Sequence, residues 1–437
     1  MKASLAFAIP AMLVLAGPPA RAEGPLHVDI TQGVSSPLLI AVPDLSSGPI
    51  SGVADGMDAG AALAAVVRAD LLSTGLYRLL AVEGRYSVAE ETSLVPFGRA
   101  GAQALVLGRV RTAPNAMLSY DCALYDVFGA RIQASQRILV SATQWRRAAH
   151  RCADLVFAAT TGDPGHFDTR VLVVRQDGTM PGQSVRLVSM DYDGANPTEL
   201  TQGQELVSMP RFAPGARSIV YLSFDQDRPV LVVADLDSGK TTRPRVPDGV
   251  LSAPRFSPDG RSIVFSLARD GDADIYKIDL ATGATRQLTS APGADTSPCY
   301  SPDGASIVFE SDRSGEPQLY LMKADGSAQK RISFGQGAHA SPIWSPQGDL
   351  IAFTASANGR LRIGVMKSDG SKERLISDGT RDEDPSWAVS GRALMFQRTT
   401  PGAALPAVWM TDLTGRVERQ VTTGGAASEP AWSGRRP

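Results

Sequence analysis

The chain has 437 residues, with 43 Lys and Arg against 45 Asp and Glu, a formal net charge of -2. This balance excludes the basic footprint of a nucleic-acid-binding or lipid-binding protein. The length exceeds what a single core holds, so two or more domains are expected. Abundant glycine (42) and proline (30) favour a turn-rich β structure.

Residues 1–22 have the pattern of a signal peptide. A positive start at Lys2 precedes the apolar run "ASLAFAIPAMLVLAG", and "ARA" ends at Ala22 as a small-residue cleavage site. We therefore expect export, with Glu23 as the first mature residue; an uncleaved membrane anchor is the alternative. No later stretch has the length and apolarity of a membrane span, which predicts a protein that does not insert directly into a membrane.

Residues 23–162 are expected to form an α/β domain. Its leading segment, 23–33, contains "LHVDI", which alternates like a strand between glycines. This segment is either a plain first strand or a mobile ligand for a partner. From Pro37 the pattern predicts the order β-α-β-β-β-α, with a first helix over 54–75 and a closing helix capped by Thr143. Such an order places helices against one sheet, and residues 163–168 follow as a linker.

A phrase such as "PRFSPDGRSIVF" recurs through the second half. Its prolines stand at 210, 254, 298, 342, 385 and 430, at intervals of 44, 44, 44, 43 and 45 residues. This is the period of a four-stranded propeller blade. Each unit divides into a short strand, a "SPDG" turn and three further strands, the first of which is apolar on both faces.

The ends of the repeat region complement each other. "PAWS" at 430–433 is a first strand without successors, whereas 169–201 supplies three strands without a first one. Five contiguous blades and one shared blade predict a six-bladed β-propeller of the WD40-like PD40 type over 169–437, closed by the C-terminal strand. An open β-array is the competing architecture. The fold class is thus an α/β domain followed by this propeller.

The three cysteines are too few for a framework of disulfide bonds that would hold the whole fold together. Cys122 and Cys152 could pair, but their spacing does not establish that their Cα atoms come close enough. Cys299 lies within the repeated phrase and is interpreted as a small buried hydrophobic residue.

No catalytic motif is present: G-x-S-x-G, H-E-x-x-H, the P-loop and G-x-G-x-x-G are all missing. Of the four histidines, His27 lies in the leading segment, His150 is expected on a solvated helix face, His166 in the linker and His339 in a loop between blades. The acidic stretches "RDEDP" and "GADTSP" are candidates for calcium binding, but carboxylates at loop tips are more often solvated, and the oxygen ligands that a calcium site needs are not evident here. We therefore expect no enzyme activity, catalytic residue, cofactor or metal.

The segments just before the repeated prolines are expected to be loops around one channel mouth. Loops gathered on one concave face are where binding residues collect, so this face is the candidate site for protein recognition. Its candidate residues are Ser208, Met209, Val250, Leu251, Asp295, Thr296, His339, Ala340, Glu383, Asp384, Ser428 and Glu429.

The order of the parts, the junction "TGDPGHFDTR", the turn "VSMDYDG" and the "PxWSPDG"-like units together resemble the TolB family, the periplasmic component of the Tol-Pal envelope system. The resemblance covers essentially the whole mature chain. Departures such as "FAPGAR", Tyr300, Gln347 and "WAVSGR" change the phrase without shifting its period.

The resemblance implies a non-enzymatic, monomeric, periplasmic coupling protein for outer-membrane integrity and envelope constriction during cell division. In that family the propeller face binds the lipoprotein Pal, the extreme N-terminal segment binds TolA, and other outer-membrane proteins are further partners. The corresponding N-terminal switch here is 23–33, with Glu23, Leu26, His27, Val28, Asp29 and Ile30 as contact residues. Two alternatives remain: a calcium-dependent hydrolase or lyase acting in the central channel, and a peptide-binding propeller outside the Tol system.

Overall fold

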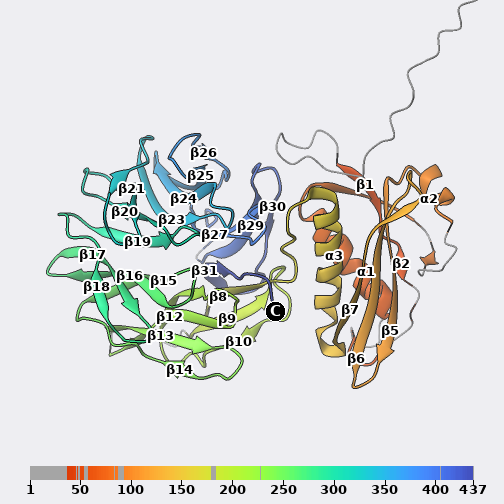
Figure 1. Cartoon of the computed structure of the whole chain (residues 1–437), viewed down its shortest axis with the longest axis horizontal. Coiled ribbons are helices and arrows are strands. Elements are labelled where there is room, and N and C mark those ends of the chain that lie inside the picture. Colours follow the sequence, from red (N-terminus) through yellow and green to blue (C-terminus); the bar gives the residue numbers. More distant parts are fainter. Residues whose placement is uncertain are drawn as a thin grey trace, which may run out of the picture.

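The computed structural model describes residues 37–436 except 46, 48–49, 54–57, 83, 87–92, 179–183, 227 and 404. The predicted signal peptide and the six N-terminal switch residues lie outside this part of the chain. Figure 1 shows two bodies side by side, a propeller and an α/β domain, with the two long helices of the latter facing the propeller. In the described part of the chain, no helix has the length and apolarity needed to cross a bilayer.

The α/β domain is built on a five-stranded sheet in the order β3-β1-β5-β6-β7. Strand β1 pairs in parallel with β3 and β5, and the remaining pairs are antiparallel. A short parallel pair, β2 and β4, lies apart from it. The elements are β1 (Leu38–Ala41), β2 (Asp44–Leu45), α1 (Ala59–Leu72), β3 (Tyr77–Leu80), β4 (Arg85–Tyr86), α2 (Val95–Arg99), β5 (Ala104–Ala113), β6 (Met117–Asp126), β7 (Arg131–Ser141) and α3 (Trp145–Thr161).

The helix ends differ from those predicted. Helix α1 begins after Asp58, whose side chain accepts a hydrogen bond from Ala61 N at 3.0 Å. Helix α3 follows a turn of 3-10 helix at 142–144, and the residue before it, Gln144, makes no side-chain cap. Thr143 is therefore not the cap, because its hydroxyl pairs with that of Ser141 at 3.0 Å. Helix α3 ends at Gly162, whose φ of 77° suits glycine.

Cys122 of β6 and Cys152 of α3 form a disulfide, and Cys299 is a buried free thiol. The disulfide ties the closing helix to β6, the strand next to the edge strand β7, and closes a loop of 30 residues. It therefore restricts the unfolded state of the α/β domain.

Six four-stranded antiparallel sheets form the propeller. Blade 1 combines β31 (Ala426–Trp432) with β8 (Arg170–Asp177), β9 (Ser184–Asp191) and β10 (Thr198–Glu199). Blade 2 consists of β11 (Val207–Phe212), β12 (Ser218–Asp225), β13 (Arg228–Asp235) and β14 (Thr241–Thr242). Blade 3 consists of β15 (Val250–Phe256), β16 (Ser262–Arg269), β17 (Asp272–Asp279) and β18 (Thr285–Gln287). Blade 4 consists of β19 (Asp295–Tyr300), β20 (Ser306–Ser311), β21 (Gln318–Lys323) and β22 (Lys330–Arg331). Blade 5 consists of β23 (Ala338–Trp344), β24 (Leu350–Ala357), β25 (Arg360–Lys367) and β26 (Arg374–Leu375). Blade 6 consists of β27 (Asp382–Trp387), β28 (Ala393–Arg398), β29 (Ala407–Asp412) and β30 (Glu418–Gln420).

The predicted ring closure is confirmed. Strand β31 pairs antiparallel with β8, with Trp432 opposite Val171. Ser433 N donates to Arg170 O, and Arg170 N donates to Ser433 Oγ, both at 2.8 Å. The two ends of the repeat region thus share one sheet, which removes the open edges.

The second strand of each blade is buried on both faces, as predicted. Ile263, Val264 and Phe265 of β16 have no exposed surface, because each sheet lies between two neighbouring sheets. The preceding turn also has its predicted chemistry: Gly260 has a φ of 71°, and Ser257 Oγ donates to Asp259 Oδ1.

Candidate functional site

A β-bulge interrupts the innermost strand of every blade at the repeated proline. In blade 3, for example, the register with β16 shifts between Ser252 and Arg255. The residue before each proline has a positive φ of 47° to 55°. Because a bulge leaves one residue outside the hydrogen-bond ladder, it accommodates a proline without a backbone donor. The six residues in this left-handed conformation are Met209, Ala253, Ser297, Ser341, Asp384 and Glu429.

The backbone N–H group of each of these six residues donates to a side chain of the preceding blade. Glu429 N donates to Gln397 Oε1 at 3.1 Å, and Ser341 N donates to Glu310 Oε2 at 3.2 Å. The other four pairs are Met209 with Glu429, Ala253 with Met209 Sδ, Ser297 with Ser266 and Asp384 with Thr354. The bulges therefore link the blades in a closed circle around the channel.

The segments predicted as loops before the prolines are in fact the first halves of the innermost strands. The residue three places before each proline is buried in its blade: Val207, Leu251, Asp295, His339, Asp382 and Ala427. Leu251, Asp295 and His339 therefore do not present their side chains to a partner in this conformation. Of the other nine residues predicted for the face, Val250 is exposed, and Ser208, Met209, Thr296, Ala340, Glu383, Asp384, Ser428 and Glu429 are half-buried.

The acidic stretches are not solvated loop tips. Asp295 has no exposed side-chain surface and accepts from Arg313 at 2.6 Å, and Asp382 accepts from Arg398 at 2.6 and 2.8 Å. Burial acts to lower the pKa of Arg398, but its bonds to Asp382 and Glu418 outweigh burial and raise it. These carboxylates form ion pairs with arginines of their own blades.

His339 is likewise a strand residue, contrary to the predicted loop position. Its Nε2 lies 2.9 Å from Glu373 Oε1, and its ring contacts Phe353 with the centroids 5.0 Å apart. It thus joins the packing of blade 5.

The channel holds charges of both signs. A cavity of about 70 Å³ is lined by the six bulge residues with Arg211, Arg255 and Pro385. Burial and the nearby Arg255 lower the pKa of Arg211 to about 10, whereas burial raises the pKa of Asp384 and of Glu429. The channel lining therefore contains two carboxylates, those of Asp384 and Glu429, beside two guanidinium groups.

Each carboxylate already has hydrogen-bond donors. Glu429 accepts from Met209 N, and Asp384 accepts from Ser341 Oγ at 3.2 Å. Two arginines balance the two acids, so the arrangement does not resemble a poised acid and base pair. It gives no support to the alternative of a channel hydrolase or lyase.

Two apolar side chains stand on the rim of this channel. Leu206, which directly precedes β11, is 54% exposed, and Val250 is 61% exposed. Both occupy the position four places before the proline, in neighbouring blades. Exposed apolar groups at equivalent positions on a rigid scaffold suit protein recognition. Leu206 was not among the residues predicted for the face, although it occupies the same repeat position as the predicted Val250.

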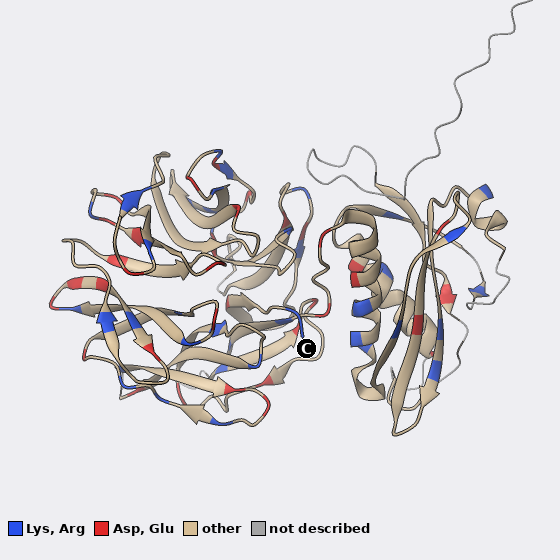
Figure 2. Cartoon of the chain, viewed as in Figure 1, with Lys and Arg blue, Asp and Glu red and all other residues tan. Residues whose placement is uncertain are grey.

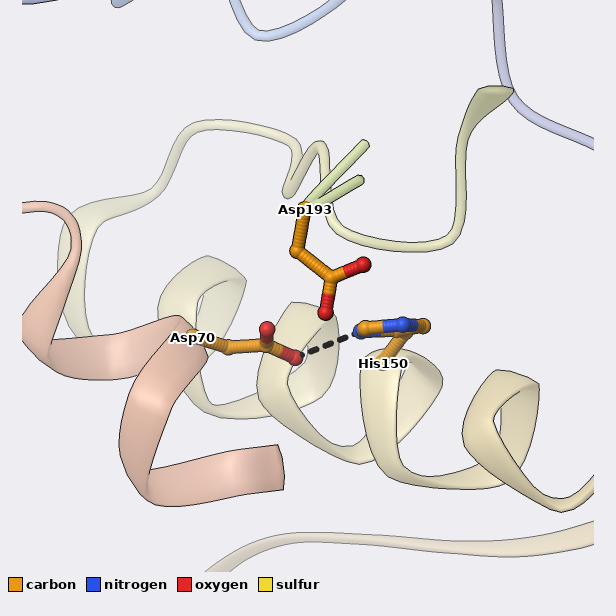
Figure 3. A group of neighbouring side chains, drawn as sticks. All are labelled: Asp70, His150 and Asp193. Atoms are coloured by element: carbon orange, nitrogen blue, oxygen red, sulfur yellow. Dashed lines mark hydrogen bonds and ion pairs between the residues drawn. The ribbon is translucent and has the colours of Figure 1, made fainter. Parts of the chain in front are cut away.

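A second constellation lies where the domains meet. Asp70 of α1 is 1% exposed and accepts from His150 Nδ1 at 2.7 Å and from Tyr192 Oη at 2.6 Å. Asp193, beside Tyr192 in the turn after β9, also approaches this cluster (Figure 3). Burial acts to lower the pKa of His150, but Asp70, Asp193 and Asp191 outweigh burial and raise it.

The predicted position of His150 on a solvated helix face is thus wrong. Ala149, Ala153 and Val156 form the buried stripe of α3, and His150 lies three residues before Ala153 on the same side. The helical periodicity of the sequence therefore could have predicted that His150 is buried. The contacts of Asp70 could not be predicted from local spacing. His150 is 80 residues away from Asp70 in the sequence, and Tyr192 is 122 residues away and belongs to the propeller.

Asp70, His150 and Asp193 offer oxygen and nitrogen atoms within 4.8 Å of one another, a set that a metal can use. In this arrangement Asp70 accepts from two donors and Asp193 binds Arg146. The charges are already paired within the protein, so the group serves as an ion-pair cluster.

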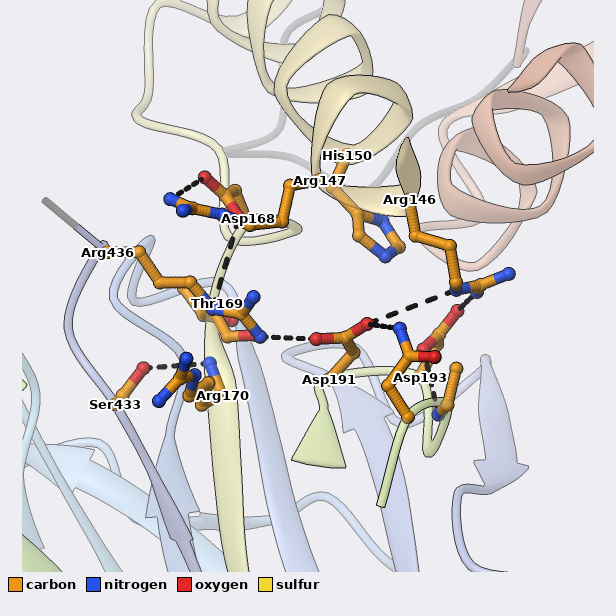
Figure 4. A network of polar contacts seen from close by, with 12 residues as sticks. Arg146, Arg147, His150, Asp168, Thr169, Arg170, Asp191, Asp193, Ser433 and Arg436 are labelled. Carbon is orange, nitrogen blue, oxygen red and sulfur yellow. Dashed lines mark hydrogen bonds and ion pairs between the residues drawn. The ribbon is translucent and has the colours of Figure 1, made fainter. Parts of the chain in front are cut away.

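Further ion pairs surround the cluster (Figure 4). Arg147 donates to Asp168 at 3.0 and 3.1 Å, and Arg436 at the end of the chain binds Asp191. His166, predicted in a linker, is buried, and burial lowers its pKa to about 3. Its ring packs against Trp432 and Tyr192, so the junction is part of the core between the domains.

Together the fold and the channel define a two-domain β-propeller protein with PD40 repeats. The family model described as the TolB amino-terminal domain matches residues 26–133, and the TolB beta propeller domain matches residues 157–436. The chain belongs to the TolB family.

Relatives and solved structures agree with this assignment. The Tol-Pal system protein TolB of Rhizorhabdus wittichii is 43% identical over 234 residues, 52% of this chain and 53% of that protein. The protein of the same name from Zymomonas mobilis is 43% identical over 220 residues, 49% and 48% of the two chains. The matched region spans about half the length of these curated relatives. The crystal structure of TolB from Acinetobacter baumannii superimposes with a TM-score of 0.81 at 25% identity, covering 93% of this chain and 99% of that one.

Proposed function

We propose that this protein is a non-enzymatic periplasmic component of the Tol-Pal system. Its propeller face would bind the lipoprotein Pal, and its leading segment 23–33 would bind TolA. In this way it would link the inner-membrane Tol proteins to the outer membrane, for membrane integrity and for envelope constriction during division. Membership of the TolB family over both domains carries the proposal.

The geometry of the face supports a binding role. Six bulges, each bonded to the preceding blade, hold the channel mouth rigidly, so a partner would bind a preorganised surface. The exposed Leu206 and Val250 supply apolar contact area at the rim. The charges of Arg211, Arg255, Asp384 and Glu429 lie deeper and set the electrostatic pattern that a partner meets.

The domain junction supports the coupling of two partners. The proposed TolA-binding residues 23–33 precede the α/β domain in the sequence, whereas the proposed Pal face belongs to the propeller. The buried Asp70–His150–Tyr192 contacts fix one domain on the other. A partner that shifts this docking at one domain would therefore alter the other.

Calorimetry with purified partners tests the proposal. The mature chain and a variant that lacks residues 23–33 are each titrated with the periplasmic domains of Pal and of TolA. The mature chain should bind both, and the deletion should abolish TolA binding and leave Pal binding intact or stronger. No binding of Pal by the mature chain, or unchanged binding of TolA by the deletion variant, contradicts the proposal.

A further inference from the structure

A basic cleft of about 350 Å³ lies between helix α3 and the end of the chain. Figure 2 shows basic positions of α3 on the side where the two domains meet, opposite the basic end of the chain. Its polar walls are Gln136 of β7, Arg147, Arg151 and Asp154 of α3, and Arg435 and Arg436 of the tail. Both domains therefore contribute to it.

Two of the four arginines are neutralised within the protein. Arg147 makes a two-pronged ion pair with Asp168, and Arg436 binds Asp191 and donates to Thr169 O at 3.2 Å. Arg151 and Arg435 make no hydrogen bond or ion pair with the described residues. The cleft thus presents two guanidinium groups whose donors are unused by the described part of the chain.

The acids of the cleft compensate for these two charges only in part. Asp168 is taken up by Arg147. Asp154 accepts hydrogen bonds from Phe167 N and Asp168 N, at 2.8 and 3.2 Å. Burial raises the pKa of Asp154 to about 6, and the charge of Arg435 acts against this rise without forming an ion pair with it. Burial and the repulsion of Arg436 and Arg147 lower the pKa of the neighbouring Arg170. A positive potential therefore remains in the cleft.

We propose that this cleft binds an oxyanion, a phosphate or carboxylate group of a ligand, between Arg151 and Arg435. Guanidinium groups recognise both anions through paired, charge-assisted hydrogen bonds. The amide of Gln136, which has no hydrogen bond to the described residues, is a further donor. Because Arg151 belongs to α3 and Arg435 to the propeller tail, the ligand would bridge the two domains. This site is separate from the channel face.

The test is calorimetric titration of the mature protein with inorganic phosphate at pH 7, at constant ionic strength maintained with chloride. Acetate serves as a second probe. The Arg151→Gln/Arg435→Gln variant removes both cations. The control, Arg269→Gln/Arg360→Gln, removes two exposed propeller arginines that likewise lack partners among the described residues. Thermal unfolding by circular dichroism verifies that both variants fold.

Phosphate should bind the wild type and the control saturably at one site, and binding should weaken at least about tenfold in the Arg151→Gln/Arg435→Gln variant. Acetate binding at the same strength as phosphate would assign the site to carboxylates, and weaker acetate binding would assign it to phosphates. Equal phosphate binding by the two double variants overturns the proposal, as does a wild type with no saturable binding of either anion. If the double variant does not fold, the single variants Arg151→Gln and Arg435→Gln are compared with Arg360→Gln in the same titration.

Discussion

The backbone N–H of Glu429 donates to Gln397 Oε1 at 3.1 Å, and this bond joins blade 6 to the blade that contains both ends of the propeller. Five equivalent bonds link the other blades at the same bulge position. The acceptors differ chemically, from carboxylate to thioether, although the geometry of the bulge is the same. The position of the bulge thus sets the link between blades, and the identity of the acceptor side chain varies.

We predict that Gln397→Ala destabilises the propeller by about 1 to 2 kcal/mol, because it leaves the half-buried N–H of Glu429 without an acceptor. The free energy of unfolding in urea measures this cost. Gln202→Ala is the control, since Gln202 is exposed and bonds to no described residue, and it should change stability by less than about 0.5 kcal/mol. Equal effects of the two substitutions would show that the bond between blades contributes nothing.

The contact between His150 and Asp70 should make stability depend on pH. The pKa of His150 is raised in the folded protein, so its stabilising charge is fully present below its unfolded pKa of about 6.5. This contribution is lost as the pH rises through the folded pKa. The wild type should therefore exceed His150→Gln in unfolding free energy by about 1 to 3 kcal/mol at pH 6, with a smaller difference at alkaline pH.

Urea unfolding of both proteins between pH 6 and pH 10 measures this difference. The comparison cancels the titration of groups that both proteins share, including Asp191, Asp193 and Arg146 around the cluster. A difference that stays constant with pH, or that grows toward alkaline pH, would be inconsistent with a charged His150 at the domain junction.

The disulfide between Cys122 and Cys152 should stabilise the α/β domain by about 3.6 kcal/mol, as expected for a closed loop of 30 residues. Cys152→Ala or a reducing agent should lower the unfolding free energy accordingly. Cys299→Ala is the control, since it removes the free thiol and should retain the full response to reductant. A wild type insensitive to reductant in the unfolding of this domain would refute the prediction.

The repeat could be predicted because its determinants are local. Each blade combines a turn with glycine at a positive φ and a short apolar strand, as in Gly260 and the following Ile263, Val264 and Phe265. Six copies at nearly constant spacing then specify the ring, and the complementary ends specify its closure. The α/β order was predicted incompletely: four strands of the main sheet, β3, β5, β6 and β7, lie between α1 and α3 where the predicted order has three, and the short elements β2, β4 and α2 were not predicted.

The bulge was not predictable from the same signals, since proline inside a strand usually argues against that strand. The predicted innermost strands therefore began three or four residues too late, and the buried Leu251, Asp295 and His339 were placed on the face. The contacts at the domain junction could not be predicted for a different reason. Asp70 and Tyr192 are 122 residues apart in the sequence, and only the tertiary fold brings them together.

The most direct measurement of the central claim is the affinity of the Leu206→Glu/Val250→Glu variant for the periplasmic domain of Pal. If the channel rim binds this partner, the two buried-interface charges should weaken binding at least about tenfold, with an unchanged thermal unfolding midpoint. Leu375→Glu is the control, because Leu375 is 46% exposed but lies on β26, the outermost strand of blade 5. Unchanged affinity of the rim variant, or equal weakening by Leu375→Glu, would contradict the account.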